Sequence, residues 1–214
     1  MPAHILLIIE IIGTIAFAVS GAEVGIKKGM DVFGVAILGL TTAVGGGVIR
    51  DLILGNTPPA TFRNPVYALV AICISIVMFL PAVRRFFAKR EQLYHYSMLL
   101  MDSLGLGIFT VMGIQTAYRM SSSHGIFLLI FVGVITGVGG GILRDVMAGN
   151  MPYVFVKHFY ATASLIGALA SVLIWPLLGD TWSMLIGAAL ITLLRLFAAH
   201  YRWSLPKAAA PIEK

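Results

Sequence analysis

The chain has 214 residues, of which 59% are hydrophobic and 11% are charged, and its mean hydropathy is +0.95. A water-soluble domain of this size cannot bury so much apolar surface, so the composition indicates a membrane-spanning protein. The net charge of +6 does not indicate nucleic-acid binding, because the basic residues lie in short loops and not on one helix face among aromatic residues. The single cysteine, Cys73, excludes a disulfide within the chain.

Windows of about 20 apolar residues predict seven transmembrane helices. In chain order, the predicted spans are 4–26, 32–54, 65–83, 97–117, 125–148, 158–178 and 182–200. The first span lacks a basic amino-terminal region and carries Glu10 in its apolar part, so we interpret it as a helix and not as a signal peptide. The expected fold class is therefore an all-α polytopic membrane protein.

The lysine and arginine residues are distributed unequally between the two sides that seven spans define. Only Arg63 and Arg119 fall on one side. The ten on the other side are Lys27, Lys28, Arg84, Arg85, Lys89, Arg90, Lys157, Arg202, Lys207 and Lys214. Because cytoplasmic loops are enriched in lysine and arginine, the distribution predicts an inner-membrane protein with its N-terminus outside and its C-terminus in the cytoplasm.

A motif with an Arg-Asp pair occurs twice in the apolar part of the chain. Gly45 to Asn56 reads GGGVIRDLILGN, and Gly139 to Asn150 reads GGGILRDVMAGN. The likeness extends to the preceding spans, so we expect three-helix repeats over residues 1–90 and 91–180, a seventh helix at 181–200 and a cytoplasmic tail at 201–214. Since three is an odd number, the second repeat must enter the membrane inverted, and such folds place their sites near the midplane.

The glycine triplet lies in the middle of its predicted span in both copies. Three glycines weaken a helix, so we expect bends whose freed carbonyl groups surround a small hydrated volume suited to a transient monovalent cation. The alternative is that the glycines let the helices pack closely. We also expect Gly46→Ala to leave insertion and assembly intact and to change conduction. The expected pathway residues are Thr42, Gly45, Gly46, Gly47, Thr136, Gly139, Gly140 and Gly141.

An arginine and an aspartate follow each triplet inside a predicted span, and charged side chains within a membrane are costly. Sequence neighbours on a helix point about 100° apart, so we expect pairs between the two copies. Arg50 is expected to pair with Asp145, and Arg144 with Asp51. Glu10 and Asp102 are competing acceptors, and they can also reach the membrane interface or accept hydrogen bonds from neighbouring helices. The network is expected to act as a gate, or alternatively as a brace that locks the repeats together.

The paired motifs GGGVIRD and GGGILRD, in the second and fifth of seven spans, resemble the prokaryotic branch of the trimeric intracellular cation (TRIC) channel family, also described as a bacterial glycine-transporter domain family. The resemblance covers about residues 4–200. It implies a homotrimer in which each subunit holds its own pore for potassium and sodium, lined by glycine-kinked second and fifth helices. The resemblance implies no cofactor; potassium and sodium are the permeant ions. Lys27 and Lys28 could attract anionic lipid, although a solvated loop explains them equally well.

Two classes of function remain open at this stage. The first is a passive channel for monovalent cations, and the second is a secondary transporter for a small amino acid such as glycine, which would use the same inverted repeats to alternate access. An enzyme is not expected, because the sequence lacks a Gly-x-Ser-x-Gly motif, a phosphate-binding loop and a His-Glu-x-x-His motif.

Overall fold

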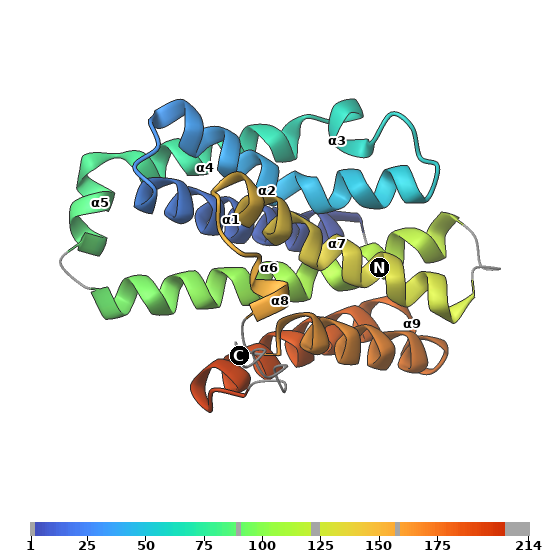
Figure 1. The fold of residues 1–214 in the computed structure, drawn as a ribbon. Helices are drawn as coiled ribbons and strands as arrows, with labels where there is room; N and C mark the ends of the chain where they lie inside the picture. Colours follow the sequence, from blue (N-terminus) through green and yellow to red (C-terminus); the bar gives the residue numbers. More distant parts are fainter. Residues whose placement is uncertain (1–2, 89–90, 121–124, 157–158, 204–214) are drawn as a thin grey trace, which may run out of the picture.

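A computed structural model describes residues 3–88, 91–120, 125–156 and 159–203, and the regular elements in these ranges are helices (Figure 1). They are α1 (Ala3–Lys27), α2 (Val32–Ile53), α3 (Ala60–Arg63), α4 (Val66–Phe79), α5 (Pro81–Ala88), α6 (Glu91–Met120), α7 (Ile126–Met147), α8 (Tyr153–Val156) and α9 (Tyr160–His200). Five of them, α1, α2, α6, α7 and α9, are long and apolar enough to cross a membrane. Lys89, Arg90, Lys157, Lys207 and Lys214 lie outside the described residues.

Helices α2 and α7, which carry the two motifs, lie within one residue of their predicted bounds. The Asp31 side chain caps α2 by accepting a hydrogen bond of 2.7 Å from the Gly34 backbone N–H. Both helices end just before the Gly-Asn pair of the motif, where Gly55 and Gly149 adopt positive φ angles of 71° and 66°. Glycine takes this conformation without strain, so the motif itself encodes the helix end.

The third and fourth predicted spans differ from the helices observed. The predicted span 65–83 is divided, because Leu80 has a ψ of 138° and separates α4 from the short helix α5. Helix α6 begins at Glu91, six residues before the predicted start at 97. Polar residues can extend a helix beyond its apolar segment, which is why a hydropathy window places the start too late.

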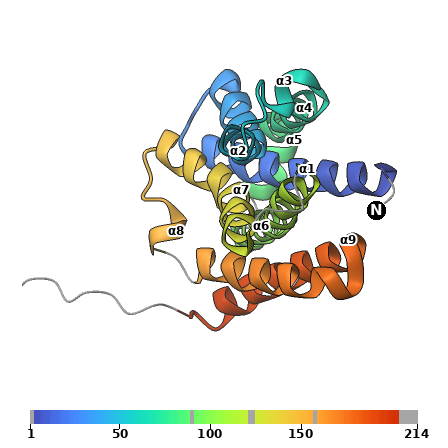
Figure 2. The same cartoon turned by 90° about the vertical axis from the view of Figure 1, so that its right-hand side faces the viewer.

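The sixth and seventh predicted spans form two arms of α9. This helix has 41 residues, and Gly179 inside it has a non-helical φ of 68° and ψ of −178°. Its length corresponds to about 60 Å, or about twice the hydrocarbon thickness of a bilayer. Figures 1 and 2 show the two arms lying side by side after the turn. The predicted break near 178–182 is therefore confirmed as a turn at Gly179.

Helices that correspond in the sequence likeness run in opposite directions. In Figure 1, α1 is antiparallel to α6, α2 to α7, and α4 to the first arm of α9. The second arm of α9 has no partner in this correspondence, and it packs against α6. Its Gly187 permits close packing on two sides, since a Cβ there would lie 2.9 Å from Val111 of α6 and 1.8 Å from the Ser171 hydroxyl of the first arm.

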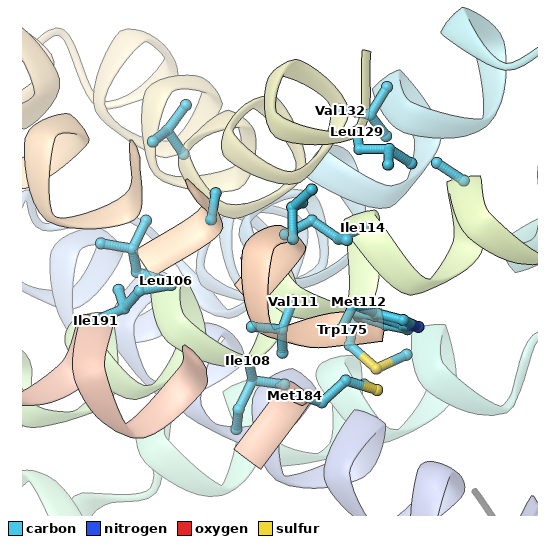
Figure 3. Close-up of a cluster of buried hydrophobic side chains, with 14 of the residues drawn as sticks. Leu106, Ile108, Val111, Met112, Ile114, Leu129, Val132, Trp175, Met184 and Ile191 are labelled. Carbon is cyan, nitrogen blue, oxygen red and sulfur yellow. The ribbon is translucent and has the colours of Figure 1, made fainter. Parts of the chain in front are cut away.

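The largest hydrophobic core lies between α6, α7 and α9 (Figure 3). Its labelled side chains are Leu106, Ile108, Val111, Met112, Ile114, Leu129, Val132, Trp175, Met184 and Ile191. The buried clusters on the side of α1, α2 and α4 are smaller, such as the one formed by Phe17, Ala18, Ala43 and Ala71. The bundle is therefore packed more extensively around the second motif than around the first.

Candidate ion pathway and charge clusters

The glycine triplets bring the backbones of α2 and α7 into direct contact. A Cβ atom on Gly46 would lie 2.1 Å from the Thr136 carbonyl oxygen, and a Cβ atom on Gly140 would lie 2.1 Å from the Thr42 carbonyl oxygen. The threonine hydroxyls donate hydrogen bonds of 2.6 Å to carbonyls of their own helices, at Leu38 and Val132. Glycine is needed at the crossing because no side chain fits between the two backbones.

The triplets lie within continuous helices and at a close backbone contact. The triplets do not break their helices, because α2 and α7 are continuous from Val32 to Ile53 and from Ile126 to Met147. An alanine methyl group at position 46 would meet the Thr136 carbonyl oxygen, so one of the two backbones would have to shift to admit it. Of the predicted pathway residues, Gly47 lines a pocket, whereas Gly46 and Gly140 are buried in the crossing.

A partly open pocket lies beside the first triplet. Its empty volume is about 440 Å³, including the open mouth. Helices α1, α2, α3, α4 and α6 contribute its lining residues, which are Glu10, Thr14, Ala43, Val44, Gly47, Arg50, Ala60, Thr61, Tyr67 and Phe109. The pocket therefore brings polar and charged side chains from four of these helices together at the side of an otherwise apolar helix bundle.

The first cluster comprises Glu10, Arg50, Asp51 and Tyr67, next to this pocket. Arg50 Nε donates to Asp51 Oδ1 over 2.8 Å, and Asp51 Oδ2 accepts a hydrogen bond of 2.7 Å from the backbone N–H of Ala60, the first residue of α3. The Tyr67 hydroxyl donates to Glu10. The Arg50 side chain is 13% exposed, so the cluster is in contact with the pocket.

The second cluster comprises the equivalent residues Asp102, Arg144, Asp145 and Tyr160. Arg144 Nε donates to Asp145 Oδ1 over 2.8 Å, and Asp145 Oδ2 accepts from the backbone N–H of Tyr153, the first residue of α8, over 2.9 Å. Arg144 Nη1 donates to Asp102. The Arg144 side chain is 0% exposed, so this cluster is enclosed in protein.

The expected pairing between the motifs is wrong. Arg50 does not pair with Asp145 and Arg144 does not pair with Asp51, because each arginine pairs with the aspartate that follows it in sequence. The argument from the helical angle fails because the motif lies at the end of a helix. There the aspartate turns to accept from the next short helix, and the long arginine side chain folds back onto it.

Glu10 and Asp102 have different surroundings, although the sequence repeat makes them equivalent. Asp102 is 2% exposed and accepts from Arg144, so the expected hydrogen bonds to a neighbouring helix are confirmed and access to the membrane interface is excluded. Glu10 is half-buried, lines the pocket and accepts from Tyr67. The expected competition for arginine is therefore confirmed for Asp102, whereas Glu10 accepts from Tyr67.

Several side chains of the clusters were missed by the sequence analysis. Ser20 of α1 accepts a hydrogen bond of 2.6 Å from Arg144 Nη1, and Glu23 accepts one of 2.9 Å from Ser97. Arg195, in the second arm of α9, is 4% exposed and stacks over the Tyr160 ring at 4.8 Å. Tyr67 and Tyr160 are separated by 93 positions, so an extension of the repeat alignment would have found this pair.

The fold and its clusters define a class of protein: an all-helical, multi-pass membrane protein with buried arginine and carboxylate pairs. The comparisons agree, because the family model described as "Glycine transporter" matches residues 7–82 and 99–176. The chain therefore belongs to this glycine transporter family, also called UPF0126, whose structural neighbours are prokaryotic TRIC cation channels. The expectation that the chain is not an enzyme is confirmed by this membership.

Curated relatives match along nearly the whole chain. The UPF0126 inner membrane protein YadS of Escherichia coli K12 is 36% identical, and the match covers 92% of this chain and 93% of YadS. A UPF0126 membrane protein of Deinococcus radiodurans is also 36% identical, with 91% and 87% covered.

Solved structures of TRIC channels match the fold. One TRIC cation channel, determined to explain conductance, has a TM-score of 0.83 and 35% identity, with 96% of this chain and 98% of that chain covered. The TRIC trimeric intracellular cation channel orthologue from Rhodobacter sphaeroides has a TM-score of 0.83 and 33% identity, with 93% and 99% covered. A prokaryotic TRIC channel crystallised in 0.5 M KCl has a TM-score of 0.84 and 33% identity, with 94% and 99% covered.

Proposed function

We propose that the protein is a channel for the monovalent cations potassium and sodium, with a pathway inside each subunit. The observation that carries this proposal is the pocket in which the Glu10 carboxylate meets hydroxyl groups and the Gly47 backbone beside a paired arginine. Oxygen-lined spaces of this kind replace part of the hydration shell of a monovalent cation. The similarity to TRIC cation channels supports the same function.

The proposed membrane arrangement has seven crossings, as two inverted three-helix repeats and a seventh helix. Support comes from the antiparallel directions of equivalent helices in Figure 1 and from the length of α9, which suffices for two crossings. We propose the inner membrane as its location, as in the name of the relative YadS. The excess of lysine and arginine on one side favours an outside N-terminus and a cytoplasmic C-terminus.

The proposed pathway leads from the pocket, past the crossing of α2 and α7, to the second cluster. Here the crossing and the second cluster are closed, because Gly46 and Gly140 contact backbone and Arg144 is fully enclosed. Conduction therefore requires the two helices to separate slightly, so that carbonyls of the triplets face the ion. In this mechanism Arg144 acts as the gate, since its side chain lies in the proposed path while it is bound to Asp102 and has to move for an ion to pass.

The proposed assembly is a homotrimer, as the name of the Rhodobacter sphaeroides relative states for that channel. Large apolar side chains cover the outside of the bundle, including Leu177 at 81% exposure and Phe127 at 82%, and these face lipid or other subunits. Lys27 and Lys28, at the end of α1, offer two positive charges to anionic lipid headgroups.

Purified protein in planar bilayers tests the channel. Discrete current steps that reverse near the potassium equilibrium potential under a KCl gradient are the expected result. The absence of single-channel current steps from bilayers that contain folded, trimeric protein would contradict the proposal.

A second candidate is a transporter for a small zwitterion such as glycine. The specific observation is that a carboxylate, Glu10, and a guanidinium, Arg50, line the same pocket, as the ammonium and carboxylate ends of an amino acid require. Proteoliposome uptake of labelled glycine separates the two candidates, because saturable uptake without unitary current favours the transporter.

A further inference from the structure

We propose that Glu10 binds the permeant monovalent cation at the mouth of the pathway. This inference rests on the proposed channel function and names one residue that captures the ion. Glu10 lies seven residues after the start of α1, about 10 Å along its axis, so it lies near one end of the bundle. Its carboxylate lines the partly open pocket, together with the hydroxyl-bearing residues Thr14, Thr61 and Tyr67.

In the first cluster, the Glu10 carboxylate supplies the net negative charge at the pocket. The charges of Arg50 and Asp51 compensate each other across 2.8 Å. Within the described ranges Glu10 has a hydrogen bond from Tyr67 and no ion pair. A carboxylate at the wall of a small, low-dielectric opening attracts cations and excludes anions, because the apolar walls focus its field.

The donor set favours a monovalent cation over a divalent one. One carboxylate with neutral hydroxyl and carbonyl oxygens matches the weak, multi-site coordination through which potassium and sodium pass. Calcium in proteins usually takes several carboxylate ligands, and magnesium retains an octahedral water shell. The second carboxylate of the cluster, Asp51, is already occupied by Arg50 and the Ala60 backbone.

The equivalent residue of the other repeat supports the assignment by contrast. Asp102 is 2% exposed and is paired with Arg144, so it offers no charge to a passing ion. Glu10 and Asp102 occupy corresponding positions, but Glu10 lines the pocket beside the first triplet whereas Asp102 is buried against Arg144. Of these two equivalent carboxylates, Glu10 is therefore the one that an ion can reach, on the side of the first motif.

Single-channel conductance in dilute and concentrated salt tests the site. Glu10→Gln keeps the size of the side chain and an oxygen that accepts from Tyr67, so folding should be preserved. We expect its conductance to fall about threefold or more at about 10 mM KCl, where the Debye length is about 30 Å, and to approach the wild-type value at about 1 M, where it is about 3 Å. Asp31→Asn, which removes an exposed charge elsewhere on the protein, should leave both conductances unchanged.

Crystals soaked in thallium, an anomalous scatterer that substitutes for potassium, test the site without requiring a current. A peak beside Glu10 in the wild type that is absent from Glu10→Gln supports the inference, even if no variant conducts and the channel proposal fails. Equal low-salt conductance in the wild type and Glu10→Gln, with no peak beside Glu10, overturns the inference while the channel proposal stands. A melting temperature raised by glycine and not by potassium, in a Glu10-dependent way, overturns the cation assignment in favour of an amino acid.

Discussion

The two copies of the motif have nearly the same sequence and the same internal hydrogen bonds, but one borders a pocket and the other is sealed. Arg50 and Arg144 each bind the aspartate that follows, at the same distance of 2.8 Å. The Arg50 side chain keeps 13% of its surface exposed, whereas Arg144 is 0% exposed and also binds Asp102. The motif therefore determines the local pairs, and the surrounding helices determine whether solvent reaches them.

The second arm of α9 accounts for much of this difference. It has no counterpart beside the first repeat, and it extends the large core of α6 and α7 (Figure 3). It also brings Arg195 over Tyr160, whereas the equivalent Tyr67 lies in the pocket wall and donates to Glu10. The second arm of α9 thus packs beside the enclosed cluster and has no counterpart beside the cluster that borders the pocket.

The largest expected effect comes from removing the carboxylate that holds the sealed end. Asp102→Asn leaves the enclosed Arg144 with one carboxylate fewer, and loss of one partner of a buried pair costs about 3–5 kcal/mol. The matched change Glu10→Gln, beside the pocket, should cost about 1 kcal/mol or less. Thermal or denaturant unfolding of both variants in detergent measures the difference, and similar losses would contradict the asymmetry.

A double-mutant cycle sharpens this result. Arg144→Gln, Asp102→Asn and the double variant should show a coupling of about 1–3 kcal/mol, because the two side chains are in direct contact. Arg50→Gln with Glu10→Gln serves as the control at the other end, where no direct pair is present in the described residues. Additive effects in the Asp102 cycle would show that Asp102 does not help to hold Arg144.

The second prediction concerns the crossing of α2 and α7, where the two glycine triplets make the same contact. Gly46→Ala and Gly140→Ala should each destabilise the protein by about 1–3 kcal/mol, despite the better helix propensity of alanine, because each methyl group meets a backbone oxygen that cannot move alone. Unfolding of the two variants, with trimer content as a second readout, checks the effect. Two stable variants would show that α2 and α7 separate easily.

Much of the helix pattern was predictable from the sequence, whereas the contacts between helices were not. The bounds of α2 and α7 follow from apolar length and from the Gly-Asn end signal. The pairing of Arg50 with Asp51 does not, because it depends on where α3 begins and presents the Ala60 N–H. The exposure of Glu10 and the burial of Asp102 depend on packing with other helices, which the sequence repeat does not encode.

The third prediction tests access to water at two equivalent positions. Val44 lines the pocket. Val138, its counterpart 94 residues later, is 3% exposed and belongs to the core between α6, α7 and α9. In a Cys73→Ser background, a membrane-impermeant thiol reagent should modify Val44→Cys about tenfold faster or more than Val138→Cys, since reaction requires an accessible thiolate. Equal rates would mean that the sealed end opens as often as the pocket.

The smallest expected effect distinguishes the third glycine of each triplet. A Cβ on Gly47 first meets Arg50 Nη2 at 3.8 Å, whereas a Cβ on Gly141 meets the Tyr160 hydroxyl at 3.2 Å as well as Arg144 Nη2 at 3.8 Å. Gly47→Ala should therefore stabilise α2 by up to about 1 kcal/mol. Gly141→Ala should be neutral or slightly destabilising, because Tyr160 is enclosed and must move a few tenths of an ångström to make room. Parallel unfolding curves measure the difference, and a greater cost at Gly47 would show that the pocket side is the more tightly packed of the two.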